Sequence, residues 1–342
     1  MSEPLEEQRP EDAAQINSII REIQSIYDAD TLFFTKEVIR KVGDELQIFQ
    51  KEEAKGREIT LRGVDGTDYK VSVAAPSHNT PAPKNQHLGG STWMISYHSI
   101  RTLTSYEYQK FMFMFMFNPQ TAYLPMQILS FTKVIENPFE YEEKRPMSST
   151  DDLRLAFQEV ERQWRTSEYH ERLQAALTML ETPLVLDKVV ALALGHIVAG
   201  SHINDRSIIQ HALVSSLHST LRRRGILTAA SKRYVQEPGY TQKDRDVLSS
   251  EGFTILNDPQ AFITLDESSI LVSICPDPPV EDIVVDICRP GIILWDDVRK
   301  SHPLSRRDSP RVVKMIKEEY YEVEFPYHES LGNLAMYIRK AA

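Results

Sequence analysis

The sequence predicts an α/β domain built on a doubly wound, mostly parallel sheet, and three observations support that fold class. An unbroken apolar strand pattern at Lys188–Leu194 runs into Gly195 and is followed by a helix pattern at 207–224. A second strand pattern at 232–236 ends in the acidic Glu237. Short apolar segments separated by helix patterns continue almost to the C-terminus, as is typical of a parallel sheet covered by helices on both faces. Together these features predict a Rossmann-like domain.

The chain of 342 residues is long enough for about two domains, and four segments can be distinguished along it. Residues 1–12 are acidic and polar, which predicts a disordered tail. Residues 13–146 mix helix and strand patterns and predict an α+β N-terminal extension. Residues 150–326 hold the Rossmann-like domain, and residues 327–342 form a C-terminal segment.

The extension is expected to contain helices, a hairpin and apolar strands. Helices are predicted at 16–26 and 31–49, hairpin strands at 58–63 and 68–73, a flexible loop at 76–90 and a strand at 124–135. The most apolar stretch, Phe111–Phe117, alternates Phe and Met. We interpret this stretch as a strand or helix buried on both faces. The alternative is an adaptable Met-rich surface that binds a partner.

The Rossmann-like domain is expected to hold five parallel strands and one further strand. A helix at 151–168 and a second one capped by Ser167 lead into the first strand. Strands are predicted at 188–194, 232–236, 252–256, 269–274 and 291–295, with helices between them at 207–224, 241–250, 258–262 and 280–288. A helix that opens at Ser309-Pro310 precedes Tyr320–Phe325, whose alternating pattern predicts an edge or antiparallel strand.

Charge and composition argue against several function classes. The net charge is −10, so general nucleic-acid binding is not expected. The one dense basic spot is Arg222–Arg224 at a predicted helix C-terminus, where cations complement the helix dipole. No stretch approaches the roughly 18 unbroken apolar residues of a membrane span, so a membrane partner is not expected either.

Cysteine usage and the N-terminus point to a reducing compartment. Cys275 and Cys288 form neither a C-x-x-C pair nor a zinc set. The acidic start of the chain is unlike a secretory or mitochondrial signal. We therefore expect a cytoplasmic protein, with the nucleus as a second location.

In a doubly wound sheet, ligands bind beyond the carboxyl ends of the strands, near the point where the strand order reverses. The cofactor-binding candidates at these ends are Gly195, His196, Glu237 and Asp258. Other candidates for the cleft are Asn257, Cys275, Asp277, Asp296 and Asp297. Glu237 is the most suggestive, because a carboxylate after the second strand can accept hydrogen bonds from both hydroxyls of a ribose. The alternative is a structural acid that caps the next turn.

The first turn, Gly195–Gly200, does not match a phosphate-binding motif. Ala193 stands where the G-x-G-x-x-G pattern would have a glycine, and Ser201-His202 replaces the Lys and Ser or Thr of a P-loop. Asp296-Asp297 could hold Mg²⁺ or act as acid and base, with solvated or capping carboxylates as the alternative.

Four histidines gather in this part of the sequence, but they do not predict a metal site. A metal would need an i, i+4 pair or a nearby cysteine or carboxylate, and we expect solvated or core-packed imidazoles instead. Nothing in the sequence lowers the pKa of Cys275, so a buried, inert thiol is expected there. The histidines are His196, His202, His211 and His218.

Several of these stretches resemble one known family. Lys188–Gly195, the helix around Gln210–Leu213 and Glu237–Asp244 carry the resemblance, which continues through Leu248 to Gly252–Leu256. They are similar to the domain named for the "sensitivity to red light reduced" proteins of plants, fungi and animals. The resemblance covers about two fifths of the chain, and the N-terminal half looks like the extension of fungal members.

The resemblance implies a Rossmann-like domain without an established catalytic activity. It implies a regulatory role, in light signalling and circadian timing in plants and in growth, stress or cytoskeletal behaviour in fungi. A link of the family to haem metabolism makes haem a weaker ligand candidate.

This chain departs from the family pattern at the strand ends. Ala193 replaces a usual glycine, and Glu237-Pro238 replaces Asp-Pro while keeping the charge. Cys275–Pro278 lacks the histidine of the family's fourth strand end, and Trp295–Asp297 stands in place of Gly-Asn-Ser. A catalytic constellation shared with the family is therefore not expected.

Three functional hypotheses follow. The first is a regulatory protein that acts through protein partners in signalling, development or stress responses. The second is an enzyme, a methyltransferase in the first instance, that binds S-adenosylmethionine or another adenosine nucleotide between Gly195 and Glu237. An antiparallel final strand at 320–325 would fit the layout of such an enzyme. The third is a scaffold whose Met- and Phe-rich N-terminal half binds a partner.

Overall fold

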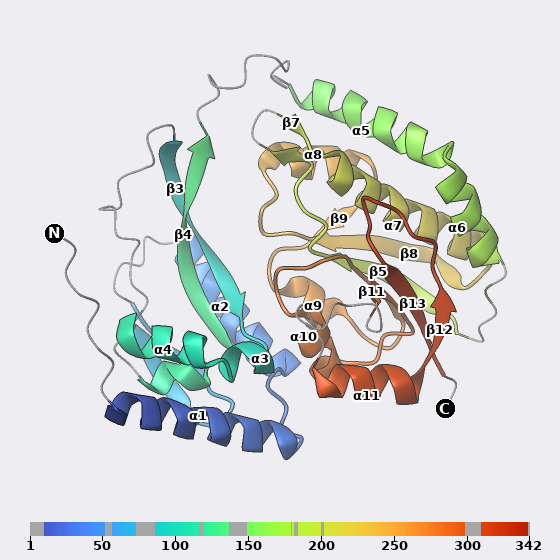
Figure 1. The fold of residues 1–342 in the computed structure, drawn as a ribbon. Coiled ribbons are helices and arrows are strands. Elements are labelled where there is room, and N and C mark those ends of the chain that lie inside the picture. Colours follow the sequence, from blue (N-terminus) through green and yellow to red (C-terminus); the bar gives the residue numbers. More distant parts are fainter. Residues whose placement is uncertain are drawn as a thin grey trace. The chain divides into compact units, whose positions relative to one another are not determined.

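The computed structural model forms two compact units (Figure 1). The first comprises residues 1–75 and 95–129, and the second comprises residues 76–94 and 130–342. Within them the structure describes residues 10–51, 57–72, 86–115, 119–136, 149–178, 180, 184–199, 202–297 and 309–340.

The first unit is built mainly from helices and one hairpin. Its elements are α1 (Pro10–Asp28), α2 (Lys36–Lys51), β1 (Glu58–Arg62), β2 (Asp68–Ser72), α3 (Ile100–Leu103), α4 (Tyr106–Phe115) and the 3₁₀ helix η1 (Pro119–Tyr123). Two long strands, β3 (Gln86–Tyr97) and β4 (Met126–Glu136), pair as a separate two-stranded sheet. The predicted hairpin is confirmed, because β1 and β2 pair antiparallel around the turn at 63–67.

Four details of the extension differ from the sequence prediction. Helix α1 already begins at Pro10, inside the predicted tail, of which residues 1–9 lie outside the described part. Helix α2 begins only at Lys36, because Thr35 Oγ1 accepts a hydrogen bond from Val38 N at 3.2 Å and caps it. Residues 86–90 of the predicted loop belong to β3, and residues 76–85 are not described.

The apolar stretch at Phe111 is the fourth difference. Met112 is 4% exposed but Phe111 is 53% exposed, so Phe111 is not buried as predicted. Helix α4 covers this position, and adjacent residues of a helix point about 100° apart, so they cannot share one face. The side chains of residues 113–117 lie outside the described part.

The second unit is an α/β domain with a seven-stranded, mostly parallel sheet, as the sequence predicts. The spatial order is β12-β13-β11-β10-β5-β8-β9. The strands are β5 (Leu186–Leu192), β8 (Leu227–Gln236), β9 (Thr254–Ile255), β10 (Ser269–Ser273), β11 (Ile292–Asp296), β12 (Tyr320–Glu324) and β13 (Leu334–Arg339). The strand order reverses between β5 and β10, which are parallel neighbours.

Strand β13 was not predicted and lies beyond the expected domain end at residue 326. It pairs antiparallel with both β11 and β12, so β12 runs in the same direction as β11. The prediction of an edge strand is confirmed for β12, but the strand that runs against the others is β13. The period-two signal is absent from β13 because five of its six residues are buried, on both faces of the sheet.

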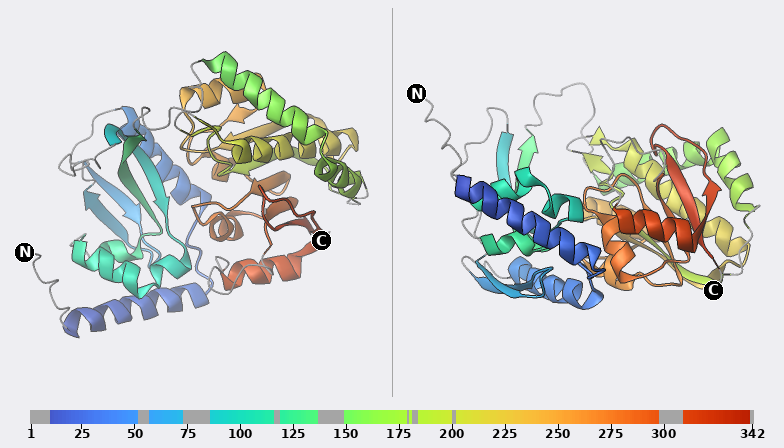
Figure 2. Two further views of the ribbon diagram at one scale, coloured as in Figure 1. Left: turned by 45° about the horizontal axis from the view of Figure 1, so that its top comes forward. Right: turned by 60° about the horizontal axis from the view of Figure 1, so that its bottom comes forward.

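Helices cover both faces of the sheet (Figures 1 and 2). The first layer contains α5 (Thr150–Arg165), α6 (Glu168–Thr178), α7 (Asp205–Arg223) and α8 (Gln242–Ser250). The second contains α9 (Gln260–Thr264), α10 (Val280–Ile287) and α11 (Pro310–Glu319). Helix α7 packs between the sheet and the α5–α6 pair, so it buries twelve of its residues. It ends where Gly225 takes the left-handed conformation, with φ of 75°, as predicted.

Candidate functional site at the strand ends

The turn after β5 has the backbone shape of a glycine-rich turn although one of its glycines is missing. Ala193 and Gly195 both have positive φ, at 57° and 72°. Left-handed backbone is natural for glycine but strained for alanine, by about 1 kcal/mol or more. The Ala193 N–H donates to Gln236 O at 3.1 Å, which ties this turn to the end of β8.

Glu237, at the end of β8, holds this turn through backbone hydrogen bonds. Its Oε2 accepts from Gly195 N at 3.2 Å, and its Oε1 accepts from Gly239 N at 2.9 Å. A Cβ added at Gly239 would lie 3.6 Å from His196 Nδ1, so the His196 ring lies beside the same turn. Glu237 therefore has the capping role that the sequence left as an alternative. It is half-buried, and each oxygen keeps a further lone pair.

A second carboxylate, Asp244, is fully buried beneath the same turn. Its Oδ1 accepts from Ile197 N at 3.1 Å and from Val198 N at 3.2 Å. Its Oδ2 accepts from both the N–H and the Oγ1 of Thr241, each at 2.7 Å. The burial of this charge is therefore compensated by four hydrogen bonds. In the sequence, Asp244 stands out only as part of a family pattern. The Thr241-x-x-Asp244 spacing of a capping box could have predicted the bonds between Asp244 and Thr241, but not those to Ile197 and Val198.

A buried polar chain continues from the turn into α7. Ser207 Oγ donates to Gly195 O at 2.8 Å, and His211 Nδ1 donates to Ser207 O at 2.7 Å. Because a carbonyl can only accept, His211 Nε2 is the acceptor in its 2.7 Å contact with the Tyr240 hydroxyl. Burial lowers the pKa of His211 to about 4 and raises the pKa of Tyr240 well above its usual value. Both side chains are therefore neutral at pH 7. The expectation of a core-packed histidine is confirmed for His211.

These contacts use up most of the turn's hydrogen-bonding capacity. The N–H groups of Gly195, Ile197 and Val198 bond to the two carboxylates. The carbonyl of His196 accepts from Asn204 Nδ2 at 3.2 Å. In dinucleotide-binding domains, the N–H groups after the first strand point at a phosphate. Here three of them point at the protein's own acidic side chains.

The ends of β10 and β11 bring Cys275 and Asp296 together. Asp296 Oδ2 accepts from Cys275 N at 3.0 Å, and its Oδ1 accepts from Cys275 Sγ at 3.3 Å. Burial, followed by the charge of Asp296, raises the pKa of the thiol, so it is protonated at neutral pH. The thiol was expected to be buried, but Cys275 is exposed, and its backbone is left-handed, with φ of 47°.

Two of the remaining candidates, Asn257 and Asp258, follow β9, and Asp258 bonds to Gln236, which directly precedes Glu237. Asp258 Oδ1 accepts from Gln236 Nε2 at 3.0 Å, and Asn257 Oδ1 accepts from Arg245 Nη1 at 3.3 Å. Asp277 is exposed, whereas Asp297 is 3% exposed and its N–H donates to Asn333 O at 2.8 Å. The structure therefore gathers Gly195, His196 and Glu237 at one turn and Cys275 with Asp296 at another.

Two bulky residues near the strand ends belong to the core. Trp295 is fully buried beside Tyr337, with ring centroids 6.3 Å apart, and Pro276 is also buried. Among the described residues, no three His, Cys, Asp or Glu side chains are grouped as a metal would need. None of the described helices is long and apolar enough to cross a membrane.

Comparison with known proteins assigns the domain. The family model of the SRR1 domain matches residues 167–338. The chain belongs to the SRR1 domain family. The matched range includes β13, so the family's domain also extends beyond the predicted end at residue 326.

No curated protein matches the chain. Among solved structures, the chain is similar to a putative class I S-adenosylmethionine-dependent methyltransferase from Listeria monocytogenes. The identity is 11% and the TM-score 0.31, over 60% of this chain and 72% of that one.

Proposed function

We propose that this SRR1 domain protein is regulatory and acts through protein partners in signalling, development or stress responses. The proposal rests on the turn after β5, whose backbone N–H groups bond to side chains of the protein itself. Glu237 and Asp244 take the N–H groups that a nucleotide-binding domain would offer to a ligand. Membership of a family with regulatory roles supports the same reading. By the same resemblance we infer a fungal-type N-terminal extension. From the cysteine usage and the acidic N-terminus we infer a cytoplasmic protein, with the nucleus as a second location.

A second candidate is an enzyme that binds an adenosine-containing cofactor beside Glu237. It is favoured by one observation, namely that Glu237 is half-buried and each carboxylate oxygen accepts only one of the hydrogen bonds above. A ribose hydroxyl could donate to either oxygen without displacing the backbone N–H groups. The residues that fit such a cofactor are Gly195, His196 and Glu237, with S-adenosylmethionine or a related nucleotide as the ligand and haem as a weaker choice.

The thermal stability of the full chain against a ligand panel separates the two candidates. The panel contains S-adenosylmethionine, S-adenosylhomocysteine, NAD, NADP, ATP and haem, tested on the wild type, Glu237→Ala and the control Asp277→Ala. We expect no stabilisation that depends on Glu237. A ligand at ~100 times its dissociation constant would add about 2.7 kcal/mol, so binding is readily seen.

One result of this ligand panel would contradict the regulatory proposal. Stabilisation by S-adenosylmethionine that is lost in Glu237→Ala and kept in Asp277→Ala would establish the cofactor site and favour the enzyme. Stabilisation by ATP that survives Glu237→Ala would be assigned to a different site.

A further inference from the structure

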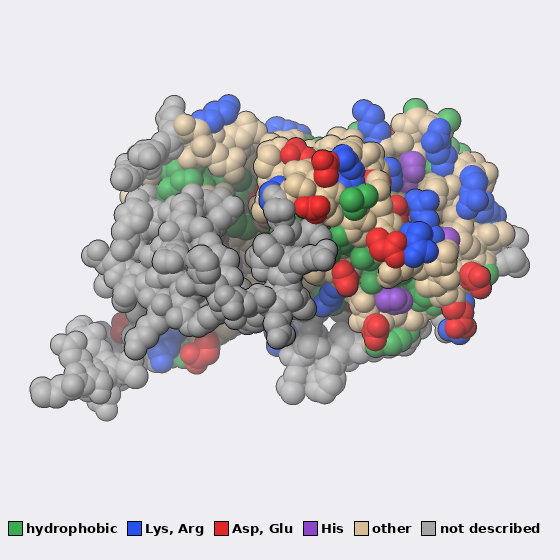
Figure 3. All heavy atoms as spheres, turned by 90° about the horizontal axis from the view of Figure 1, so that it is seen from above, with side chains coloured by type: hydrophobic (Ala, Val, Ile, Leu, Met, Phe, Trp, Pro, Cys, Tyr) green, Lys and Arg blue, Asp and Glu red, His purple; other side chains and the backbone are tan. Residues whose placement is uncertain are grey.

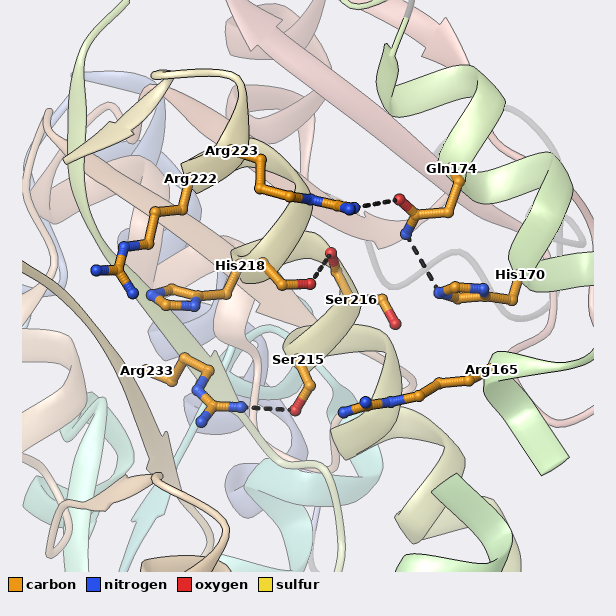
Figure 4. A pocket seen from close by; sticks show the side chains of 10 residues that line it. Arg165, His170, Gln174, Ser215, Ser216, His218, Arg222, Arg223 and Arg233 are labelled. Carbon is orange, nitrogen blue, oxygen red and sulfur yellow. Dashed lines mark hydrogen bonds between the residues drawn. The ribbon is translucent and has the colours of Figure 1, made fainter. Parts of the chain in front are cut away.

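A concave pocket lies on the helical side of the SRR1 domain, away from the strand-end turn. It is bounded by the end of α5, by α6, by the C-terminal half of α7 and by β8, and its volume is about 900 Å³. Pockets of about 300–1,000 Å³ are typical of small-molecule sites. Figure 4 shows Arg165 and Arg233 reaching toward Ser215 from opposite sides, with Arg222 and Arg223 above them.

Four guanidinium groups line this pocket, and three of them form no ion pair with a carboxylate among the residues that the structure describes. Arg165 pairs with Glu161 at 2.9 Å. Arg223 donates to Gln174 Oε1 and Thr220 Oγ1, at 3.1 and 3.2 Å, and both acceptors are neutral.

In the described part of the chain, the other two arginines form no ion pair either. Arg233 donates to Ser215 Oγ and to the backbone carbonyl of Glu251, each at 2.8 Å. The Glu251 carboxylate instead accepts from Gln158 at 2.9 Å. The guanidinium of Arg222 makes no hydrogen bond or ion pair within the described residues. In a chain with net charge −10, such a local surplus of positive charge is unusual.

The arginines lower the pKa of two imidazoles in the pocket, in addition to the larger effect of burial. Burial lowers the pKa of His170, and the charges of Arg165 and Arg223 lower it further. Burial also lowers the pKa of His218, again with contributions from Arg233 and Arg222. The residues that line the pocket include four arginines and no acidic residue, so its lining carries a positive charge, although burial lowers the pKa of Arg233 and the nearby carboxylates of Glu161 and Glu251 act on it to raise that pKa.

The chemistry of the lining selects a particular class of ligand. The planar fork of arginine matches phosphate in geometry, and arginines on separate elements can hold separate phosphoryl groups. Where Figure 3 colours described residues, acidic side chains lie among the basic ones, and this part of the surface shows no continuous basic track for a nucleic acid. We propose that the pocket between Arg165, Arg222, Arg223 and Arg233 binds a small metabolite that carries two or more phosphoryl groups. This site is separate from the strand-end turn and does not depend on the function proposed for it.

Binding of inorganic tripolyphosphate to the full chain tests this site. We expect saturating tripolyphosphate to raise the melting temperature by about 5 °C over KCl of equal ionic strength. Titration calorimetry should show about tenfold weaker binding for both Arg222→Gln and Arg165→Gln, since each removes one charge-assisted contact. Arg172→Gln on α6 is the matched control, because Arg172 pairs with Glu168 outside the pocket. That control and Glu237→Ala should bind within about twofold of the wild type.

Three results would overturn the proposal. Equal weakening by Arg172→Gln and Arg222→Gln would mean a diffuse charge effect. Weakening by Arg222→Gln but not by Arg165→Gln would reduce the site to a helix terminus. Tighter binding of a phosphopeptide or an RNA oligonucleotide than of tripolyphosphate, lost in Arg222→Gln, would replace the metabolite with a macromolecule.

Discussion

The strand-end turn and the arginine-lined pocket belong to one domain but handle charge in opposite ways. At the turn, Glu237 and Asp244 bond to backbone N–H groups, so acidic groups and donors satisfy one another. In the pocket, Arg222, Arg223 and Arg233 have no acidic partner within the described residues. A charged group that is paired within the protein contributes to stability, whereas a cation without an opposite charge beside it can still bind an anionic ligand. The strand-end turn, where the fold class predicts a ligand, is therefore the region whose hydrogen-bonding groups are already paired within the protein.

The largest expected effect is at Asp244. Asp244→Ala should lower the free energy of unfolding by about 4 kcal/mol, because it leaves the buried N–H groups of Ile197 and Val198 without an acceptor. Urea unfolding followed by tryptophan fluorescence measures it, since all three tryptophans lie in the second unit. The control Asp246→Ala removes an exposed carboxylate of the same helix and should cost no more than about 0.5 kcal/mol. Equal costs for the two variants would contradict the bracing role of Asp244.

The buried imidazole makes the turn's stability depend on pH. The pKa of His211 is about 4 in the folded chain and about 6.5 when unfolded, so the unfolded state binds the extra proton between these values. The contribution of His211 is complete above pH 6.5 and is lost as the pH falls toward 4. We expect the stability difference between the wild type and His211→Gln to shrink by roughly 2–3 kcal/mol between pH 7.5 and pH 4.5. Urea titrations at the two pH values test this, and an unchanged difference would show that His211 is not held neutral.

A smaller effect is expected at Glu237. Glu237→Ala should cost about 1–2 kcal/mol, less than Asp244→Ala, because the carboxylate is half-buried and water can replace it at Gly195 and Gly239. The same urea titration measures it. Asp277→Ala at the same sheet edge should change stability by less than about 0.5 kcal/mol, because Asp277 is exposed. A cost for Glu237→Ala as small as that of the control would leave Glu237 available to a ligand and weaken the contrast between the two sites.

The smallest effect is expected in the pocket without ligand. Arg222→Gln should change the free energy of unfolding by less than about 0.5 kcal/mol, since its guanidinium bonds to nothing in the described structure. Arg224→Gln provides the comparison within the same triplet. Arg224 Nη1 donates to the carbonyls of Leu177 and Leu180, at 2.6 and 2.5 Å, so its loss should cost about 1 kcal/mol. A larger cost at Arg222 than at Arg224 would mean that Arg222 is structural and would count against a ligand site.

Much of the fold could be predicted from local patterns. The apolar run at 188–194 and the stop at Gly225 identify β5 and the end of α7 because burial and left-handed backbone leave a direct mark on sequence. Strand β13 left no such mark, because it is inserted between β11 and β12 and buried on both faces. The exposure of Phe111 was also missed, because composition cannot say which face of a helix has a neighbour.

The candidate site could be predicted in position but not in role. Strand ends identify Glu237 and Cys275, because any doubly wound sheet gathers its strand ends at one edge. The partners of Glu237 depend on how the turns at 193–197 and 237–241 fold against each other. Those partners, Gly195 and Gly239, are distinguishable from other glycines only in three dimensions.

The sequence by itself determined the fold class and the family, because alternating apolar strands and helices leave few other ways to bury a core. The sequence also identified Arg222–Arg224, but only as cations at the C-terminus of a helix, where they complement the helix dipole. Only the tertiary structure separated these three arginines, turning Arg224 toward the end of α6 and placing Arg222 and Arg223 beside Arg165 and Arg233. The physical reason is that electrostatic interactions act through space. A guanidinium is neutralised or left in surplus by side chains that are distant in sequence, so no local pattern can record which occurs.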